Sequence, residues 1–317
     1  MRPSALTAQV EEYRATRQKL GFALRVEGEE LLRFARYAES IGHNGPLTIE
    51  LAVRWATTAA SKYPRYRARR LDAVRRFAKY RQLFDPKTEV PPGGLLGPSC
   101  RSRPSPHIYS GQEIEELLRA ASRLGPAGGL RPRTYVTLFG LLACTGLRIS
   151  EALRLTCTDV DLNAGVLTVA ESKFHRSRLV PLHPSTTRAL RAYADKRASH
   201  RWSGDSNAFF LTERGTSLKY RRVLMNFWAL RQQLGWTETR GLKPRIHDLR
   251  HTFAVRRLLG WYEEGVEVGQ RIVALSTYLG HVKVKDTYWY LTATPELLAA
   301  TARRCELAAP PNIGRRP

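Results

Sequence analysis

Cysteine is scarce in this sequence and is scattered along it. The four cysteines are Cys100, Cys144, Cys157 and Cys305, and none lies in a C-x-x-C motif. Their spacing predicts neither a structural zinc site nor a disulfide framework. Such sparing use of cysteine fits a reducing cytoplasm.

Long apolar runs are also missing. No run reaches the roughly 18 residues that a membrane-spanning helix needs. The first residues, MRPSALTAQVEEY, lack the apolar stretch of a signal peptide. We therefore expect no membrane partner and a cytoplasmic protein.

Acidic residues are few relative to basic ones. The chain of 317 residues has 28 Asp and Glu against 52 Lys and Arg, which gives a formal net charge of +24. Such an excess repels itself unless a polyanion neutralises it, and nucleic acid is the polyanion that this charge favours. Charge alone gives affinity without sequence preference, and it does not imply catalysis. Hydrophobic residues make up 43% of the chain, enough for a buried core.

The first part of the chain has a helical pattern. Apolar residues recur at helical spacing, as in residues 31–38, and we expect a helical bundle over residues 1–95. Pro, Gly and Ser then become frequent, so we place a linker at residues 96–108. Ser110 and Glu113 have the spacing of a capping box, which predicts a helix start just after the linker.

The second predicted domain, residues 109–317, has a different pattern of apolar residues. Its segment TYVTLFGLLACTGL is strongly apolar and predicts a buried helix. The later segment LNAGVLTVAESKFHRSRLVPL alternates around turn residues and predicts a small antiparallel sheet. Helical patterns return from Pro184 onward. The expected fold class is therefore mainly α with a small antiparallel β-sheet, an α+β arrangement.

Four segments carry residues suited to chemistry on a phosphodiester. They are TGLRISEALRL (145–155), ESKFHRSRLVPL (171–182), HDLRHTF (247–253) and YLGHVKVKDTYWY (278–290). In type, spacing and order they resemble the catalytic motifs of the tyrosine recombinase, or phage integrase, family. The resemblance spans roughly residues 108–307, and the N-terminal region resembles the SAM-like core-binding domain of that family.

The resemblance implies a site-specific recombinase or integrase, similar to the enzymes of mobile elements. Such an enzyme cleaves and rejoins DNA through a covalent 3′-phosphotyrosyl intermediate, with no metal ion and no cofactor. The implied partner is double-stranded DNA, which also implies a nucleoid-associated protein. Assembly would be a tetrameric synapse of identical subunits, or a synapse shared with partner recombinases.

Two arginines and a lysine match positions that act on the phosphate in this family. Two guanidiniums can grip the two non-bridging oxygens by forked hydrogen bonds, a role that falls to Arg148 and Arg250. The alternative for Arg148 is a surface salt bridge with Glu151. Lys173 matches the hairpin lysine that protonates the leaving 5′-hydroxyl, and its alternative is an ordinary lysine at a hairpin tip.

The histidines and tyrosines complete the predicted site. His247 and His281 match the family's phosphate-contacting positions, and the resemblance implies that His247 could also assist proton transfer from the nucleophile. The alternative for single histidines is a packing or capping role. His251 also fits the family pattern, and we interpret it as structural. Tyr290, nine residues after His281, is the predicted nucleophile. For Tyr288 and its neighbour Trp289 we expect core packing.

Other features concern DNA and partners. The basic helices predict DNA contacts, against the alternative of a solvated face, through Arg65, Arg67, Arg69, Arg70, Arg75, Arg221 and Arg222. The segment PELLAATARRCEL predicts a helix that starts at Thr294-Pro295-Glu296. This helix packs on its own chain or, as the family resemblance implies, docks onto a neighbouring protomer. The segment WYEEGVEVGQ predicts a lengthened loop between two helices.

Three other functions fit parts of the pattern. HDLRH places two histidines four residues apart, as in a metalloprotease, but no third ligand is evident. A type IB topoisomerase shares the tyrosine chemistry and relaxes supercoils as a monomer. A catalytically silent DNA-binding protein would explain the charge but would not require the tyrosine.

Overall fold

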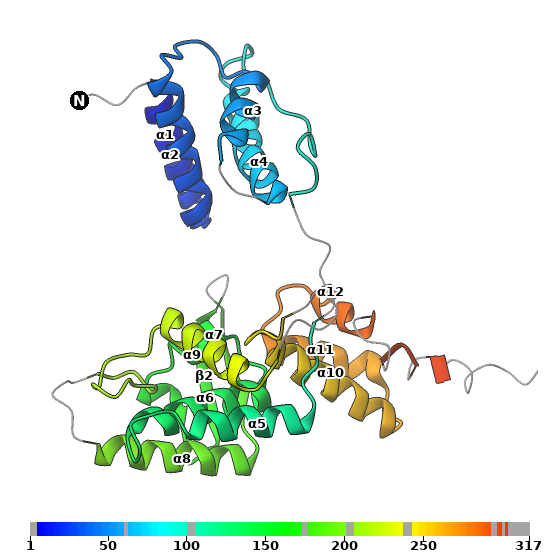
Figure 1. The fold of residues 1–317 in the computed structure, drawn as a ribbon. Coiled ribbons are helices and arrows are strands. Elements are labelled where there is room, and N and C mark those ends of the chain that lie inside the picture. The colour runs from blue at the N-terminus through cyan, green and yellow to red at the C-terminus, as the bar shows by residue number, and fades with distance from the viewer. Residues whose placement is uncertain are drawn as a thin grey trace, which may run out of the picture. The chain divides into compact units, whose positions relative to one another are not determined.

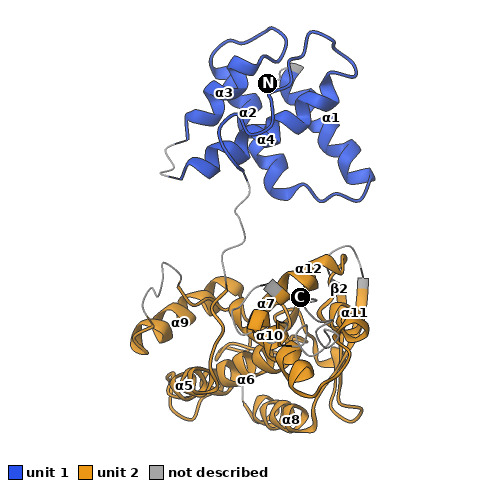
Figure 2. Ribbon diagram, turned by 90° about the vertical axis from the view of Figure 1, so that its right-hand side faces the viewer, with its two compact units in different colours: residues 1–104 blue, residues 105–317 orange. Residues whose placement is uncertain are grey.

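The structure is a computed structural model that describes residues 5–59, 63–99, 106–172, 176–200, 206–236, 243–292, 297–299 and 302–303. The chain forms two compact units, residues 1–104 and residues 105–317 (Figure 2). The division falls within the segment where the sequence predicts a linker. Each unit has its own hydrophobic core.

Unit 1 is helical over the part that the structure describes. Its helices are α1 (Ala5–Lys19), α2 (Arg25–Ser40), α3 (Ile49–Thr57) and α4 (Pro64–Arg81) (Figure 1). The side chain of Thr48 caps α3 by accepting from the backbone N–H of Leu51. The apolar faces of these helices meet around Phe34, Trp55 and Phe77, as the periodicity predicts.

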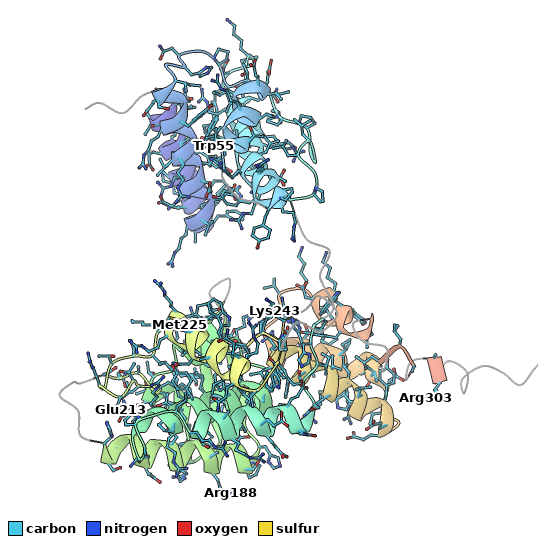
Figure 3. The ribbon with its side chains drawn as sticks, viewed as in Figure 1. Trp55, Arg188, Glu213, Met225, Lys243 and Arg303 are labelled. Carbon is cyan, nitrogen blue, oxygen red and sulfur yellow. The ribbon has the colours of Figure 1, made fainter. Side chains whose placement is uncertain are left out.

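A buried ion pair connects three helices of unit 1. Arg70 on α4 is only 8% exposed. Its guanidinium stacks 3.8 Å from the ring centre of Trp55, which is labelled in Figure 3, and lies 3.5 Å from the Glu30 carboxylate. Desolvation lowers the pKa of Arg70. Arg70 therefore stabilises unit 1 and has little surface left for a phosphate, which counts against its predicted contact with DNA.

Unit 2 combines helices with one small sheet. Its longer helices are α5 (Gly111–Ser122), α6 (Leu130–Thr145), α8 (Pro184–Ser199), α9 (Tyr220–Gln233), α10 (Asp248–Glu263) and α11 (Val268–Leu279). Its short helical turns are α7 (Ile149–Ala152), η1 (Cys157–Asp159), α12 (Lys285–Tyr288) and η2 (Trp289–Thr292). The mainly α fold with one small sheet is confirmed. The capping box is also present, because Ser110 and Glu113 exchange hydrogen bonds at the start of α5.

The sheet is antiparallel, as the alternating pattern predicts. Its strands β1 (Val160–Asp161), β2 (Val166–Ser172) and β3 (Arg176–Pro181) lie in the order β1-β2-β3. Leu167 pairs with Val180, and both side chains are buried. The tip of the β2–β3 hairpin, including Lys173, lies outside the described residues.

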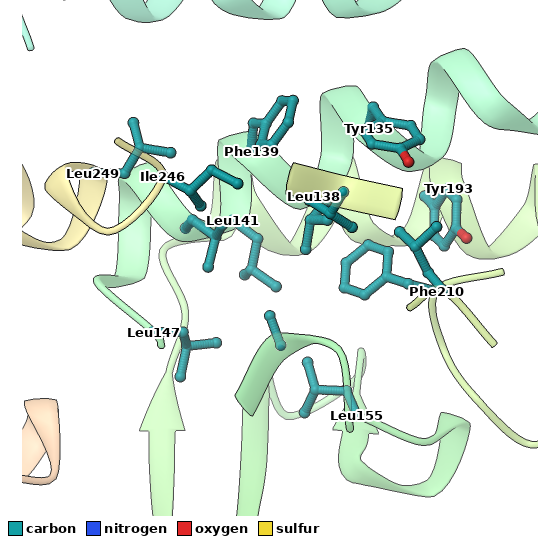
Figure 4. Packing of buried hydrophobic residues seen from close by; sticks show 14 of the residues in the cluster. Tyr135, Leu138, Phe139, Leu141, Leu147, Leu155, Tyr193, Phe210, Ile246 and Leu249 are labelled. Atoms are coloured by element: carbon teal, nitrogen blue, oxygen red, sulfur yellow. The ribbon is translucent and has the colours of Figure 1, made fainter. Parts of the chain in front are cut away.

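Helix α6 lies at the centre of the main core of unit 2. It runs beside α5 and α8 (Figure 1). Figure 4 shows Leu138 and Phe139 of this helix among other buried apolar residues, including Phe210. A second apolar cluster lies between α10 and α11 and includes Tyr290. The predicted nucleophile therefore sits on a packed part of unit 2.

One predicted loop is wrong. The segment WYEEGVEVGQ forms the end of α10 and the start of α11, and only residues 264–267 connect the two helices. The helix continues through Trp261 and Tyr262 because these rings pack against the second apolar cluster. Gly265, with φ +71°, then reverses the chain.

Among the helices within the described ranges, none has the length and apolar character needed to cross a bilayer. The predicted start of the C-terminal helix at Thr294-Pro295-Glu296 falls outside these ranges.

Candidate active site

Three arginines meet at the C-terminal end of α11. The last carbonyls of an α-helix lack partners within the helix and carry partial negative charge. Three side chains donate to these carbonyls: Arg178 Nε to Tyr278 O at 2.8 Å, Arg250 Nη2 to Leu279 O at 2.7 Å, and Arg148 Nη2 to Gly280 O at 3.0 Å. The end of α11 thus gathers guanidiniums from three separate elements. We call Arg148, Arg178 and Arg250 the arginine cluster.

Glu151 is the carboxylate of the arginine cluster. It accepts from Arg148 Nη1 at 2.7 Å and from Arg178 Nη2 at 2.9 Å, and its side chain is only 1% exposed. Burial alone would raise the pKa of Glu151, but hydrogen bonds and charge from Arg178 and Arg148 lower it to about 2. The salt bridge considered as an alternative for Arg148 is therefore real. It lies inside the cluster, where it fixes the guanidinium.

Arg250 is the most deeply buried member of the cluster. It also donates from Nη1 to the carbonyl of Gly146, the residue that ends α6, at 2.7 Å. Desolvation and then repulsion from Arg148 lower the pKa of Arg250 to about 10. Arg250 therefore remains a cation at neutral pH, in fixed geometry.

His247 stands at the start of α10, three residues before Arg250. Part of its side chain reaches the surface, whereas Arg250 on the same helix is buried. The protein around the imidazole nevertheless excludes much of the water. Desolvation and then the positive charge of Arg250 lower the pKa of His247. Its imidazole is accordingly neutral in the free protein near pH 7, able to accept a proton or to donate an N–H.

Tyr290 lies on η2 and is 2% exposed. Its hydroxyl is 3.1 Å from Nδ1 of His251. The ring of His281 stacks on the Tyr290 ring, with 6.2 Å between centroids and 17° between planes. His281 is itself oriented by a 2.7 Å hydrogen bond between its Nδ1 and the hydroxyl of Thr287. Two histidines thus adjoin the predicted nucleophile.

The two neighbours of Tyr290 behave differently. Trp289 packs against the second apolar cluster, as expected. Tyr288 is 47% exposed, so its predicted core packing is wrong. The chain turns helically here, and two residues of helix rotate a side chain by more than half a turn. Tyr288 therefore faces solvent where Tyr290 faces the core.

The contacts bring together most of the predicted site. Arg148, Arg250, His281 and Tyr290 gather around the end of α11, and His247 adjoins through a 4.7 Å edge-to-face contact with His251. Lys173 falls outside the described residues. Of the described residues, no group of three or more His, Cys, Asp and Glu could hold a metal ion.

Sequence reasoning missed three residues that orient the others. Arg178 was not singled out within its motif, yet its guanidinium donates to the Tyr278 carbonyl and pairs with the Glu151 carboxylate. Thr287 orients His281. His251 was interpreted as structural, although its position four residues after His247 in one helix already placed both on one face.

The remaining predicted DNA contacts lie on two helices. Arg221 and Arg222 are exposed on α9, close to the exposed Met225 labelled in Figure 3. On α4, Arg67 and Arg69 are exposed, while Arg65 and Arg75 are half-buried. These side chains remain predictions as DNA contacts.

Comparisons with known proteins identify the family of this chain. The model of the phage integrase family matches residues 109–296. The chain is 42% identical over 310 residues to y4rB of Sinorhizobium fredii, a protein named for an inferred integrase or recombinase activity, with 96% of this chain and 98% of the relative covered. It is 30% identical over 237 residues to the tyrosine recombinase XerC of Chlamydia caviae, covering 74% and 69% of the two chains.

Solved structures share the fold. The recombinase XerH in a post-cleavage complex on its difH substrate gives a TM-score of 0.65 at 18% identity, with 96% of this chain and 86% of that chain covered. The integrase of transposon Tn1549 with transposon end DNA gives 0.64 at 18% identity, with 96% and 100% covered.

The fold and the family match define an enzyme that breaks and rejoins DNA strands. More specifically, the chain belongs to the phage integrase family of tyrosine recombinases, as a site-specific recombinase or integrase.

Gly280→Ala tests the packing of the arginine cluster. Gly280 has φ +69°, and a Cβ there would lie 2.7 Å from Arg178 Nη1. Gly265→Ala is the matched control, because Gly265 has φ +71° and open space at its Cβ. Backbone strain of about 1–2 kcal/mol is expected in both variants. Only Gly280→Ala should also slow DNA cleavage, as measured by covalent adduct formation. Equal rates in the two variants would show that the cluster tolerates displacement.

Proposed function

We propose that this protein is a recombinase of a mobile element that cleaves DNA by attack of Tyr290 and forms a 3′-phosphotyrosyl intermediate without a metal ion. The observation that carries the proposal is the convergence of the arginine cluster and Tyr290 at the end of α11. The relative named for an integrase or recombinase activity supports the recombinase reaction, and the mobile-element branch rests on the resemblance of the motifs.

In the proposed reaction, positively charged and hydrogen-bonding side chains surround the phosphate. Arg148 and Arg250 would hold the two non-bridging oxygens and stabilise negative charge in the transition state, with His247 and His281 as further donors. The Oη–P bond to Tyr290 forms as the P–O5′ bond breaks. The phosphotyrosyl ester conserves the bond energy, so rejoining needs no nucleotide cofactor.

Double-stranded DNA is the proposed partner, and the working form is a synapse of several subunits. Among fold relatives, XerH is bound to difH and a lambda integrase dimer is bound to a core site. The basic surfaces of α4 and α9 would contact the DNA backbone. The subunits of the synapse would be identical copies or partner recombinases.

Lys173→Ala tests the proton donor. We propose that Lys173 protonates the leaving 5′-oxygen, a step that typically contributes about 10²–10⁴ in rate. A 5′-phosphorothiolate leaves as a stable thiolate and needs no proton, so this substrate should restore much of the cleavage lost in Lys173→Ala. Arg148→Ala is the control, since its loss concerns the non-bridging oxygens and should not be rescued. Equal rescue of both variants would contradict the assignment.

One experiment separates the proposal from its alternatives. The protein is incubated in EDTA with supercoiled plasmids that carry one or two copies of the DNA that flanks its gene. A recombinase inverts or excises the segment between two copies, whereas a topoisomerase relaxes either plasmid without changing its sequence. A silent DNA-binding protein would produce no covalent adduct on a nicked substrate, and that result would overturn the proposal.

A further inference from the structure

His251 makes a direct contact with the proposed reacting atom. It lies on α10, one turn after His247, and its Nδ1 is 3.1 Å from the hydroxyl oxygen of Tyr290. Its ring also packs against Trp289, with 5.5 Å between ring centroids. The imidazole is therefore held in place by packing as well as by a hydrogen bond.

The three histidines of the candidate site have different surroundings: His251 and His281 contact Tyr290, and His247 contacts His251. His247 is exposed at the start of α10, next to the positive charge of Arg250. His281 presents its ring face to the ring of Tyr290, and its Nδ1 bonds Thr287. His251 presents a ring nitrogen to the phenolic oxygen. By geometry, His251 is well placed to exchange a proton with this oxygen.

We propose that His251 is a catalytic residue that accepts the phenolic proton of Tyr290 during cleavage and returns it during rejoining. This rests on the proposed function and names His251, which contacts the phenolic oxygen directly, as the base rather than His247. In cleavage the proton of Tyr290 passes to His251 Nδ1, the Oη–P bond forms and the P–O5′ bond breaks. The leaving O5′ takes a proton from a cationic acid, proposed above to be Lys173. Rejoining reverses each transfer.

In this role His251 acts only on the proton of the Tyr290 hydroxyl and not on the leaving 5′-oxygen. A base for the nucleophile matters when a tyrosine attacks or departs, because a free phenol has a pKa of about 10 and is mostly protonated at neutral pH. If His251 acts only on Tyr290, its loss should not change the rate of a reaction in which Tyr290 takes no part. Such a reaction separates proton transfer from a general effect on packing.

The first measurement is cleavage of a nicked suicide substrate. His251→Ala should lower the rate of adduct formation about 10²-fold or more. His251→Gln keeps a polar side chain but cannot carry the proton, so it should be similarly slow. A 5′-phosphorothiolate should rescue neither variant, because the missing proton acceptor is on the other oxygen. Cleavage at the wild-type rate by His251→Gln would overturn the proposal.

The second measurement removes the tyrosine. In a Tyr290→Phe background, a strand with a free 5′-hydroxyl is joined to a 3′-(p-nitrophenyl phosphate) end, whose leaving group needs no proton. Adding His251→Ala should leave this joining unchanged, whereas adding Arg250→Ala should suppress it. Loss of joining with His251→Ala would show that His251 serves the phosphate or the packing of the site, and would overturn the proposal.

These results are separable from a failure of the proposed function. If the wild-type protein forms no covalent adduct, the proposed function itself fails before His251 is tested. Folding is controlled with His107→Ala, because His107 is another half-buried histidine of unit 2, paired with Glu113 rather than with Tyr290. His107→Ala should cleave at the wild-type rate.

Discussion

Tyr290→Phe is expected to abolish covalent attachment to DNA, while Tyr288→Phe leaves it intact. The hydroxyl of Tyr290 contacts His251 and its ring stacks on His281. Phe keeps the ring and its packing but removes the hydroxyl oxygen of Tyr290 that would form the phosphotyrosyl bond. Tyr288 is half-exposed and points away. The two substitutions are chemically identical, so each controls for the other.

The measurement is a denaturing gel of protein incubated with a labelled, nicked substrate in EDTA. Tyr290→Phe should give no adduct and should lose about 1 kcal/mol of stability with its hydrogen bond. Tyr288→Phe should match the wild type in yield and stay within about 0.5 kcal/mol in stability. An adduct that survives Tyr290→Phe and disappears in Tyr288→Phe would transfer the nucleophile to Tyr288.

Glu151→Gln should cause the largest loss of stability. Glu151 is buried between Arg148 and Arg178, and removal of its charge leaves two guanidiniums without a counter-ion. Breaking a buried ion pair from one side costs about 3–5 kcal/mol. Cleavage should also slow, because Arg148 loses the partner that fixes its direction. Urea unfolding and adduct formation measure the two effects.

The loss of stability in Glu151→Gln should depend on pH in a defined direction. The pKa of Glu151 is about 2 in the folded protein, against 4.5 as the ordinary value. A lowered carboxyl pKa stabilises the fold above the unfolded pKa, and that stabilisation is lost as pH falls toward the folded pKa. The lowering corresponds to about 3 kcal/mol. The stability gap between wild type and Glu151→Gln should therefore shrink from pH 5 downward.

Glu113→Gln is the matched control for this gap. Glu113 caps α5 from a partly exposed position, where its carboxylate accepts from the backbone N–H of Ser110. The loss expected there is about 1 kcal/mol. If Glu151→Gln loses no more unfolding free energy than Glu113→Gln, solvent already screens the charges of the arginine cluster.

Local chemistry made much of the fold predictable. The capping box at Ser110 and Glu113 and the alternating strands follow rules that span a few residues, and the structure confirms both. The loop expected at WYEEGVEVGQ was wrong because Trp261 and Tyr262 are kept helical by packing with distant residues. The burial of Arg70 has the same origin. Its partners, Glu30 and Trp55, belong to other helices.

The candidate site was likewise predictable in its residues but not in the contacts that hold them. Motif register selected Arg148, Arg250, His281 and Tyr290, which the fold does gather. What register could not show is how they are held. The carbonyls that orient the arginines are backbone atoms at a helix end, and backbone carbonyls leave no trace in the residue types of a motif.

The arginine cluster also makes folding sensitive to the ionic surroundings of the protein. The lowered pKa of Arg250 shows that folding places this cation where desolvation and Arg148 oppose its charge. An anion that binds the folded cluster relieves this repulsion, and a ligand that binds only the folded state stabilises it by mass action. The cellular DNA that the family acts upon would then serve the chain as a folding ligand. The protein should therefore unfold at its lowest temperature when it is newly made and not yet bound to DNA.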